Sequence, residues 1–398
     1  MKSLTGYLAE QAGKNTHMTH IEDLVLDGGV KGARQAILAL RSLRDMLSGN
    51  AKSSIDVTVK WDGAPAVFAG EDPATGEFFV AKKGVFNANP KVYKNHADID
   101  ADTSGDLNKK LKKAFDNLKD VGIKGVIQGD FMFDKADLKT EKIDGVSYVT
   151  FHPNTIVYAV PKGSAMEKEI SRAEIGIVWH TKYEGGTFET MKADFGREIA
   201  SKLRKTSKVW AVDATLDDLS GTASMTKEQT AEVTKNLSEA GKIFKQISGT
   251  VLKEIEKNKE LNLIINTYNN TKVRANTRIT NTEQHTKGLI DFVNQRYAKQ
   301  IDKLKSPAGK QKKESQRDEL LKFFDKKNQK NLKKVFDLQN FIVDAKLIII
   351  NKLNSLSNIN TFVKTKSGFK VTNPEGFVAI DRMEGGAVKL VDRLEFST

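Results

Sequence analysis

The sequence contains no cysteine and only seven prolines among its 398 residues. The absence of cysteine excludes disulfide bonds and thiolate metal sites, and it is compatible with a reducing cytoplasm. No apolar run is long enough to span a bilayer, because the most apolar stretch, 345–353, contains Lys346, Asn351 and Lys352. Residues 1–13 also lack the apolar core of a signal peptide. These absences favour a cytoplasmic protein that uses neither membrane insertion nor cysteine chemistry.

Positive charge exceeds negative charge, with 64 Lys and Arg against 51 Asp and Glu and a net charge of +13 at pH 7. The excess is concentrated in segment 296–334, which holds fourteen Lys and Arg and five Asp and Glu. Such a run is usually the solvated face of a helix, but it also favours a polyanionic partner such as nucleic acid. The residues we expect to contact a phosphate backbone are Lys310, Lys312, Lys313, Lys326, Lys327 and Lys330. Contacts of this kind would be independent of base sequence and weakened by salt.

Hydrophobic periodicity divides the chain into four parts. Apolar residues three and four apart predict an N-terminal helical segment in 1–50 and a basic helical region in 201–365. The part between them, 51–200, is rich in strand patterns, and strands return in 366–398. We therefore expect an α+β fold of antiparallel sheets and helices, formed by 51–200 and 366–398 and interrupted by a long helical insertion.

Several elements within these parts are expected individually. A capping box at Thr226 and Gln229 precedes one apolar stripe, 233–255, and a second stripe runs through 332–353. Both stripes are more typical of core packing than of a ligand site. The expected strands include 55–59, 66–70, 125–133, 150–160, 374–380 and 386–393.

The stretch Lys60-Trp61-Asp62-Gly63 stands where a strand ends and a turn begins. Residues 55–59 alternate between apolar and polar side chains, and Asp62-Gly63 is a turn signal. A lysine at this junction has a fixed backbone and a side chain free to enter a cleft, where its neutral amine can attack a phosphorus or carbonyl centre. On its own, the same pattern also describes an exposed hairpin turn, so its function depends on the other charged residues.

Charged residues recur at the later strands in a particular order. Lys83 follows the strand near 78–82, and Asp130 stands among apolar residues of the strand 125–133. Because an unpaired buried charge is costly, Asp130 must find a cation, a metal ion or several hydrogen-bond donors. Near the C-terminus, Glu375 opens one short strand and Lys389 lies in the centre of the next.

Taken in this order, the motifs resemble those of the covalent nucleotidyltransferases, the superfamily of ATP-dependent DNA and RNA ligases and mRNA-capping guanylyltransferases. The resemblance implies an adenylation domain that binds ATP and Mg²⁺, with Lys60 as the catalytic nucleophile. It implies a lysyl-AMP intermediate and the joining of 5′-phosphate to 3′-hydroxyl ends of DNA or RNA. Lys83 and Lys389 near Lys60 would favour the neutral amine. The nucleotide-binding residues implied are Val59, Asp62, Gly63, Lys83, Tyr158, Val160 and Lys389, and the metal ligands implied are Asp130 and Glu375.

The chain also departs from the pattern of that superfamily. Pro65 stands where many ligases have arginine, Val160 precedes Pro161 where a Phe-Asp pair is usual, and Val391 replaces a second basic residue. Glu184-Gly185 is a rival to Glu375 as the carboxylate motif. These departures keep two other functions open: a catalytically inactive nucleotidyltransferase-like protein that binds nucleic acid or an assembly partner, and a guanylyltransferase.

One expected absence concerns the closing domain. Ligases of the DNA type usually continue into an OB-fold domain that closes over the nucleotide, and only nine residues follow Lys389. We therefore expect no C-terminal OB fold and assign the clamping of nucleic acid to the helical insertion. A compact ligase-like chain of this kind would suit a virus, possibly a phage, which would place it in the host cytoplasm.

Overall fold

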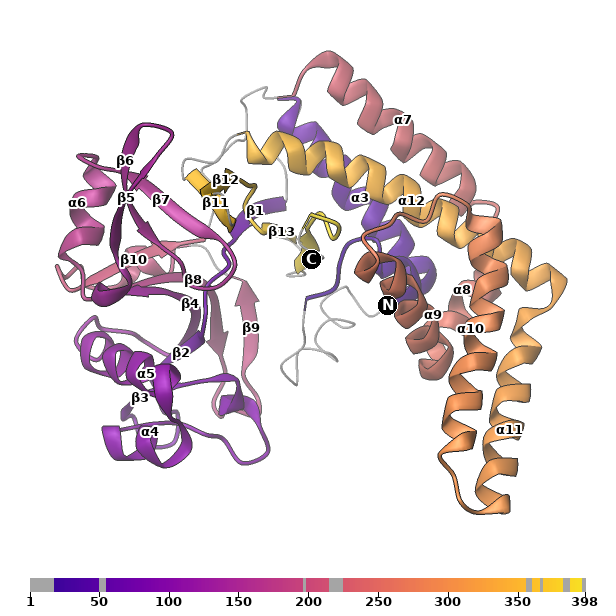
Figure 1. Ribbon diagram of the computed structural model, residues 1–398, viewed down its shortest axis with the longest axis horizontal. Coiled ribbons are helices and arrows are strands. Elements are labelled where there is room, and N and C mark those ends of the chain that lie inside the picture. The colour runs from indigo at the N-terminus through magenta and orange to yellow at the C-terminus, as the bar shows by residue number, and fades with distance from the viewer. Residues whose placement is uncertain are drawn as a thin grey trace. The chain divides into compact units, whose positions relative to one another are not determined.

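The computed structural model describes residues 18–49, 55–195, 198–214, 225–355, 360–365, 368–381 and 387–395. Within these ranges the protein is a mixed α and β structure with several sheets, compatible with the α+β class (Figure 1). It divides into two compact units. The first, which we call the sheet unit, combines residues 1–18, 54–218 and 353–389; the second, the helical unit, combines 19–53, 219–352 and 390–398.

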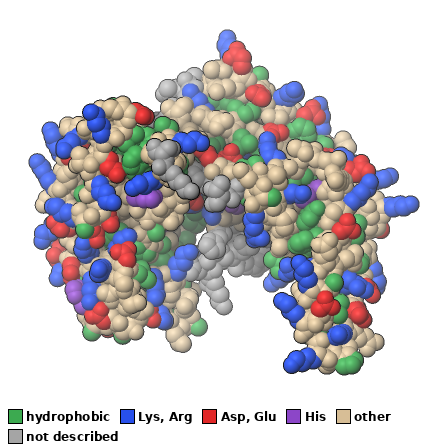
Figure 2. All heavy atoms as spheres, in the orientation of Figure 1, with side chains coloured by type: hydrophobic (Ala, Val, Ile, Leu, Met, Phe, Trp, Pro, Cys, Tyr) green, Lys and Arg blue, Asp and Glu red, His purple; other side chains and the backbone are tan. Residues whose placement is uncertain are grey.

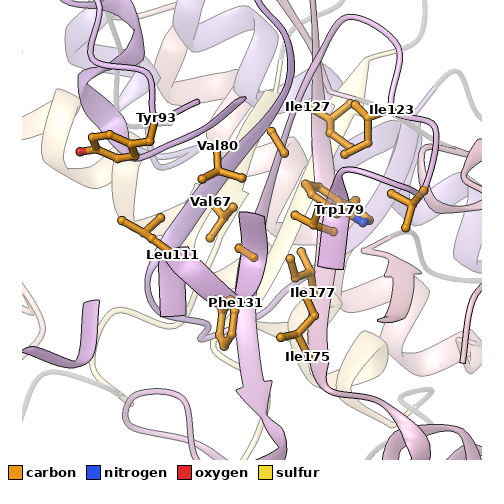
Figure 3. Close-up of a cluster of buried hydrophobic side chains, with 14 of the residues drawn as sticks. Val67, Val80, Tyr93, Leu111, Ile123, Ile127, Phe131, Ile175, Ile177 and Trp179 are labelled. Carbon is orange, nitrogen blue, oxygen red and sulfur yellow. The ribbon is translucent and has the colours of Figure 1, made fainter. Parts of the chain in front are cut away.

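A six-stranded sheet forms the centre of the sheet unit. Its order is β10 (Val209–Asp213), β8 (Ile175–Glu184), β4 (Val126–Asp134), β2 (Ala66–Glu71) and β3 (Phe78–Ala81), with β9 (Lys192–Phe195) also pairing with β8. Neighbouring strands are antiparallel except for the parallel pair β10–β8. The short helix α4 (His96–Asp102) leads into α5 (Gly105–Leu118), whose apolar residues are buried in the same core as side chains of the sheet. Figure 3 shows this core, to which Val67, Val80, Leu111, Ile127, Phe131, Ile177 and Trp179 contribute.

Two smaller sheets complete this unit. One has the order β1 (Ile55–Lys60), β13 (Gly376–Asp381) and β14 (Ala387–Leu390), so it joins segments from both sides of the helical unit in the sequence. The other has the order β12 (Gly368–Val371), β11 (Asn360–Thr365), β7 (Val157–Pro161), β6 (Val146–Phe151) and β5 (Lys139–Ile143). Helix α6 (Ala165–Arg172) and the 3-10 turns η1 (Lys83–Phe86), η2 (Lys135–Asp137) and η3 (Ala200–Lys202) connect the strands.

The described helices of the helical unit follow a simple order. They are α2 (Leu24–Asp27), α3 (Gly29–Leu47), α7 (Lys227–Phe244), α8 (Gly249–Lys257), α9 (Lys259–Arg274), α10 (Thr282–Asp302), α11 (Pro307–Leu321) and α12 (Lys326–Asn354), with the 3-10 turn η4 (Lys322–Phe324) before α12. The capping box expected at Thr226 and Gln229 begins α7. The apolar stripe expected in 332–353 is the buried face of α12, where Leu332, Val335, Leu338, Ile342, Ala345, Ile349 and Leu353 are fully buried. No helix in the described ranges is long and apolar enough to cross a membrane.

A buried ionic cluster ties segment 390–395 to the helices of this unit. The ammonium of Lys346 on α12, only 1% exposed, donates hydrogen bonds of 2.9 Å to both carboxylate oxygens of Glu22. It also donates to the carbonyl oxygen of Val391 at 2.8 Å, while Arg393 donates to both carboxylate oxygens of Asp23 at 3.0 and 3.1 Å. Burial alone would raise the pKa of Glu22, but the nearby cations, Lys346 first, outweigh it and lower that pKa to about 2.

Three expectations from the sequence differ from the structure. The single strand expected in 150–160 is two strands, β6 and β7, because Pro153 cannot continue a ladder and His152 Nε2 contacts the Thr155 carbonyl oxygen at 3.1 Å to close a turn. The stripe 233–255 is two helices, α7 and α8, separated by residues 245–248.

The third difference concerns the boundaries of the expected insertion, 201–365. Strands β10 and β11 lie inside that range but pair with strands of the sheet unit, so the helices run only from 227 to 354. The expected N-terminal segment, 1–50, is not a separate part, because its helix α3 belongs to the same compact unit as α7 and α8. Residues 1–17 of that segment lie outside the described residues.

Candidate active site

The sheet unit contains a cavity of about 470 Å³ that opens at the end of β1. A volume of this size is typical of small-molecule and cofactor sites. Its walls come from β1, β4, β8, β9, β13, β14 and the turn η1. The charged and ionisable side chains of the lining are Lys60, Asp62, Lys83, Asp130, His180, Tyr183, Glu375 and Lys389.

Antiparallel pairing of β1 with β13 brings Lys60 to Glu375. The register places Lys60 opposite Gly376, so the residue before Gly376 lies just beyond the end of β1. The Lys60 ammonium forms an ion pair with the Glu375 carboxylate, and the two side chains are 23% and 27% exposed. Both groups are therefore partly buried at the wall of the cavity. The neighbouring strand β14 places Lys389 on the same wall.

Asp62 fixes the turn that follows β1. Its carboxylate accepts hydrogen bonds from the backbone N–H groups of Thr155 and Ile156 at 2.6 and 2.9 Å, and from the Asn154 side chain at 2.8 Å. The residue is only 8% exposed. Because both oxygens are already occupied, Asp62 acts on the site by holding the turn against the start of β7, although it also lines the cavity. The sequence had assigned it to the nucleotide.

Gly63 lets this turn lie directly on β4. A Cβ atom at Gly63 would stand 2.5 Å from the Cβ of Asp130 and 2.8 Å from the Sδ of Met132. Two backbone hydrogen bonds of 3.0 Å, Ala64 N–H to the Phe131 oxygen and Phe131 N–H to the Pro65 oxygen, hold the two segments together. A residue larger than glycine would push the turn away from β4. Gly63 thus brings Asp130 to the cavity that contains Lys60.

Asp130 has a neighbour that the sequence did not reveal. The Nε2 atom of His180 lies 3.8 Å from an Asp130 carboxylate oxygen, and its Nδ1 atom is 2.7 Å from the Thr181 hydroxyl. The sequence had placed His180 merely at a strand end. A β-bulge in β4 at Gln128/Gly129, which changes the register of β4 against β8, sets this geometry and has no local sequence signal.

The two carboxylates of the cavity have the chemistry of a magnesium site. Asp130 and Glu375 offer hard oxygen atoms, are 21% and 27% exposed, and line the same cavity. Mg²⁺ is often held by one or two carboxylates and keeps several waters. The described part of the chain has no cluster of three or more His, Asp or Glu side chains that could form a larger cage. The donor set therefore fits Mg²⁺ better than a metal held by protein ligands alone.

Tyr158 and Val160 lie in the core and do not line the cavity. They are 2% and 3% exposed, and burial raises the pKa of Tyr158. The Tyr158 hydroxyl accepts a hydrogen bond of 2.7 Å from the Asp62 N–H, and its ring stacks on Trp61 with centroids 5.0 Å apart. These residues support the turn, and their expected contact with the nucleotide is not reproduced. The apolar lining comes instead from residues that the sequence did not single out, Phe86, Phe188, Met191, Phe195, Val378 and Ile380.

The remaining expected residues separate clearly. Val59 lines the cavity beside Lys60, whereas the rival carboxylate Glu184 is exposed, pairs with Lys182 and lies outside the lining. The six lysines expected to bind nucleic acid belong to the helical unit, with Lys310, Lys312 and Lys313 on α11 and Lys326, Lys327 and Lys330 on α12.

The fold and the site define a mixed α and β protein whose sheet unit holds an ionic cavity large enough for a small-molecule ligand. The chain belongs to a protein family of unknown function, DUF6267, whose model matches residues 15–398. No curated protein matches the chain, and no solved structure matches it.

Proposed function

We propose that this protein is an ATP-dependent polynucleotide ligase, or a related adenylyltransferase, with Lys60 as its nucleophile. One observation carries the proposal: Lys60, Asp130, Glu375 and Lys389 line the same cavity although they come from distant parts of the chain. An ordinary exposed hairpin turn, the alternative for Lys60-Trp61-Asp62-Gly63, has no reason to gather these groups.

In the proposed first step, the neutral amine of Lys60 attacks the α-phosphorus of ATP. A nitrogen–phosphorus bond forms, the bond to pyrophosphate breaks, and the amine loses a proton, which gives lysyl-AMP. Lys83 and Lys389 on the cavity wall would offset negative charge on the α-phosphate in the transition state. Mg²⁺ held by Asp130 and Glu375 would supply further charge neutralisation and orient the leaving group.

In the proposed second half, a 5′-phosphate oxygen attacks the phosphorus of lysyl-AMP and releases Lys60. A 3′-hydroxyl then attacks the activated 5′-phosphate, forms the phosphodiester bond and expels AMP. The apolar wall with Phe86, Phe188 and Met191 offers the base a surface in place of buried Tyr158. This assigns the base to a different wall from the one that the resemblance implies.

The test is covalent labelling with ATP that carries a radioactive α-phosphate, in the presence of Mg²⁺. We expect the wild-type protein to retain label after denaturation and Lys60→Ala to retain none. Lys124→Ala is the matched control, because Lys124 belongs to the same unit, is 84% exposed and lies outside the cavity lining. Asp130→Asn and Glu375→Gln should label more slowly.

Two outcomes would contradict the assignment. A wild-type protein that takes no label from ATP refutes the adenylyltransferase, and labelling by GTP alone would replace it with a guanylyltransferase. Label retained by Lys60→Ala would transfer the role of nucleophile to another residue.

A second candidate is a nucleotidyltransferase-like protein without chemistry that binds nucleic acid. It is favoured by the backbone of Val391, the position where a second basic residue is usual, because its carbonyl oxygen is occupied by the buried Lys346. This candidate predicts nucleic-acid binding that is salt-dependent, independent of ATP and unchanged in Lys60→Ala.

A further inference from the structure

The helical unit has a cavity of its own, about 350 Å³ in volume, between the start of α8 and the first turns of α12. We call it the lysine groove. Its lining consists of Gln246, Ile247, Ser248, Lys327, Lys330, Asn331 and Lys334. No acidic residue lines it, so the described lining carries positive charge only.

Local geometry aligns the three lysines. Lys327, Lys330 and Lys334 are three and four residues apart on α12 and therefore share one face of that helix. The backbone N–H of Ser248 donates to the Asn331 side chain at 2.8 Å, and Lys334 donates to the Gln246 carbonyl oxygen at 3.4 Å. These contacts hold the N-terminus of α8, which bears partial positive charge, beside the lysines.

The positive charge of the groove is not balanced by the protein. Among the described residues, none forms an ion pair with Lys327, Lys330 or Lys334, whereas the adjacent Lys333 pairs with Asp337 at 2.8 Å. Like charges at these spacings destabilise a helix by a few tenths of a kcal/mol per pair. The arrangement therefore weakens α12 and favours an external anion.

The neighbouring helix α11 differs in this respect. Its basic residues alternate with Glu314, Asp318 and Glu319, and Arg317 pairs with Asp318 at 2.8 Å. Lys313 lies over the ring of Tyr297, 5.7 Å from its centroid. Figure 2 shows basic and acidic side chains mixed over the lobe formed by α10 and α11. The two halves of the basic segment are thus electrostatically unlike, although the sequence treated them as one.

We infer that the lysine groove is the place where this protein binds the phosphate backbone of nucleic acid, and that α11 is not. The choice of nucleic acid as the anion rests on the proposed function. Lys327 and Lys334 are seven residues apart, a rise of about 10 Å along the helix. Successive phosphates of one strand rise by about 3.4 Å, so the groove matches about three of them.

The experiment compares two triple variants that remove the same charge. One is Lys327→Ala/Lys330→Ala/Lys334→Ala and the other is Lys310→Ala/Lys312→Ala/Lys313→Ala. Binding is measured by fluorescence anisotropy with a labelled oligonucleotide, as single strand and as nicked duplex, over a range of salt concentrations. Far-UV circular dichroism checks that both variants retain their helices.

We expect the groove variant to bind on the order of 100-fold more weakly at 0.1 M salt, with the slope of log K against log salt reduced by about 2 to 3. The α11 variant should change affinity by less than about fivefold, because its charges are largely balanced within the helix. Equal losses in both variants, a greater loss in the α11 variant, or no binding by the wild-type protein would overturn the inference.

Two further measurements separate this inference from the proposed function. Labelling of Lys60 by ATP needs no nucleic acid, so the groove variant should label like the wild-type protein. If labelling fails in both but oligonucleotide binding follows the groove, the groove stands and the enzyme does not. Binding to vesicles of phosphatidylserine and phosphatidylcholine in preference to the oligonucleotide, lost in the groove variant, would replace nucleic acid with a membrane surface and refute our choice.

Discussion

Replacing Lys346 by methionine should destabilise the helical unit strongly. The substitution keeps the volume and removes the only charge that contacts both oxygens of Glu22, whose side chain is 6% exposed. Removing one partner of a buried ion pair costs about 3–5 kcal/mol. Arg393 remains 3.6 Å from Glu22 and retains part of the compensation, so we expect the lower end, about 3 kcal/mol at neutral pH.

The pH dependence of this loss has a definite sign. In the wild-type protein the pKa of Glu22 is lowered from 4.5 to about 2, so its contribution is present above pH 4.5 and is lost as the pH falls toward 2. In Lys346→Met, burial raises the pKa of Glu22 above its ordinary value instead. The folded variant then takes up a proton on acidification, and its stability rises as the pH falls from neutrality toward 4.5. The difference between the two proteins should therefore narrow in that range.

Denaturant unfolding followed by far-UV circular dichroism is the appropriate assay, because α12 and its neighbours dominate the helical signal. All three tryptophans, Trp61, Trp179 and Trp210, belong to the sheet unit, so tryptophan fluorescence follows that unit in the same samples. The double variant Glu22→Gln/Lys346→Met removes both charges and should recover most of the loss. Unchanged midpoints in Lys346→Met, or a double variant less stable than the single one, would refute this account of the cluster.

Two other substitutions test the site and a buried histidine. Gly63→Ala should destabilise the sheet unit by about 1–3 kcal/mol and abolish labelling by ATP, because the new Cβ meets Asp130; Gly241→Ala, where a Cβ meets nothing within 4 Å, should stabilise α7 by about 0.5–1 kcal/mol, and equal behaviour of the two in unfolding would count against us. Burial lowers the pKa of His285 from 6.5 to about 4, so the free energy of unfolding should fall as the pH drops from 6.5 toward 4, and His285→Gln should flatten that slope.

Local physics made much of the fold predictable. The stripe on α12 repeats at helical spacing through 332–353, and burial of that face follows directly from the pattern. The capping box at the start of α7 and the strand before Lys60 were equally local. The parallel pairing of β10 with β8 could not be anticipated, since it depends on a partner more than 30 residues away. The division of 233–255 into two helices was missed because both halves share one apolar period.

The candidate site divides in the same way. The order of motifs gathered Lys60, Asp130, Glu375 and Lys389, which the structure brings to one cavity. The supporting residues were assigned wrongly, because a sequence does not show which polar groups satisfy one another. Asp62 and Tyr158 are hydrogen-bonded within the protein, whereas His180 reaches Asp130 only through the register of β4 and β8.

The small sheet β1–β13–β14 also has a consequence for synthesis of the protein. Its first strand is translated before the residues of α7 to α12 and its other two strands after them. A nascent chain on the ribosome therefore carries Lys60 without Glu375 or Lys389, and an unpaired strand edge, until translation passes residue 389. Such an edge is prone to pairing with other chains. Early exposure of β1 should make truncated products stick to one another, and it keeps the cavity unassembled until the protein is nearly made.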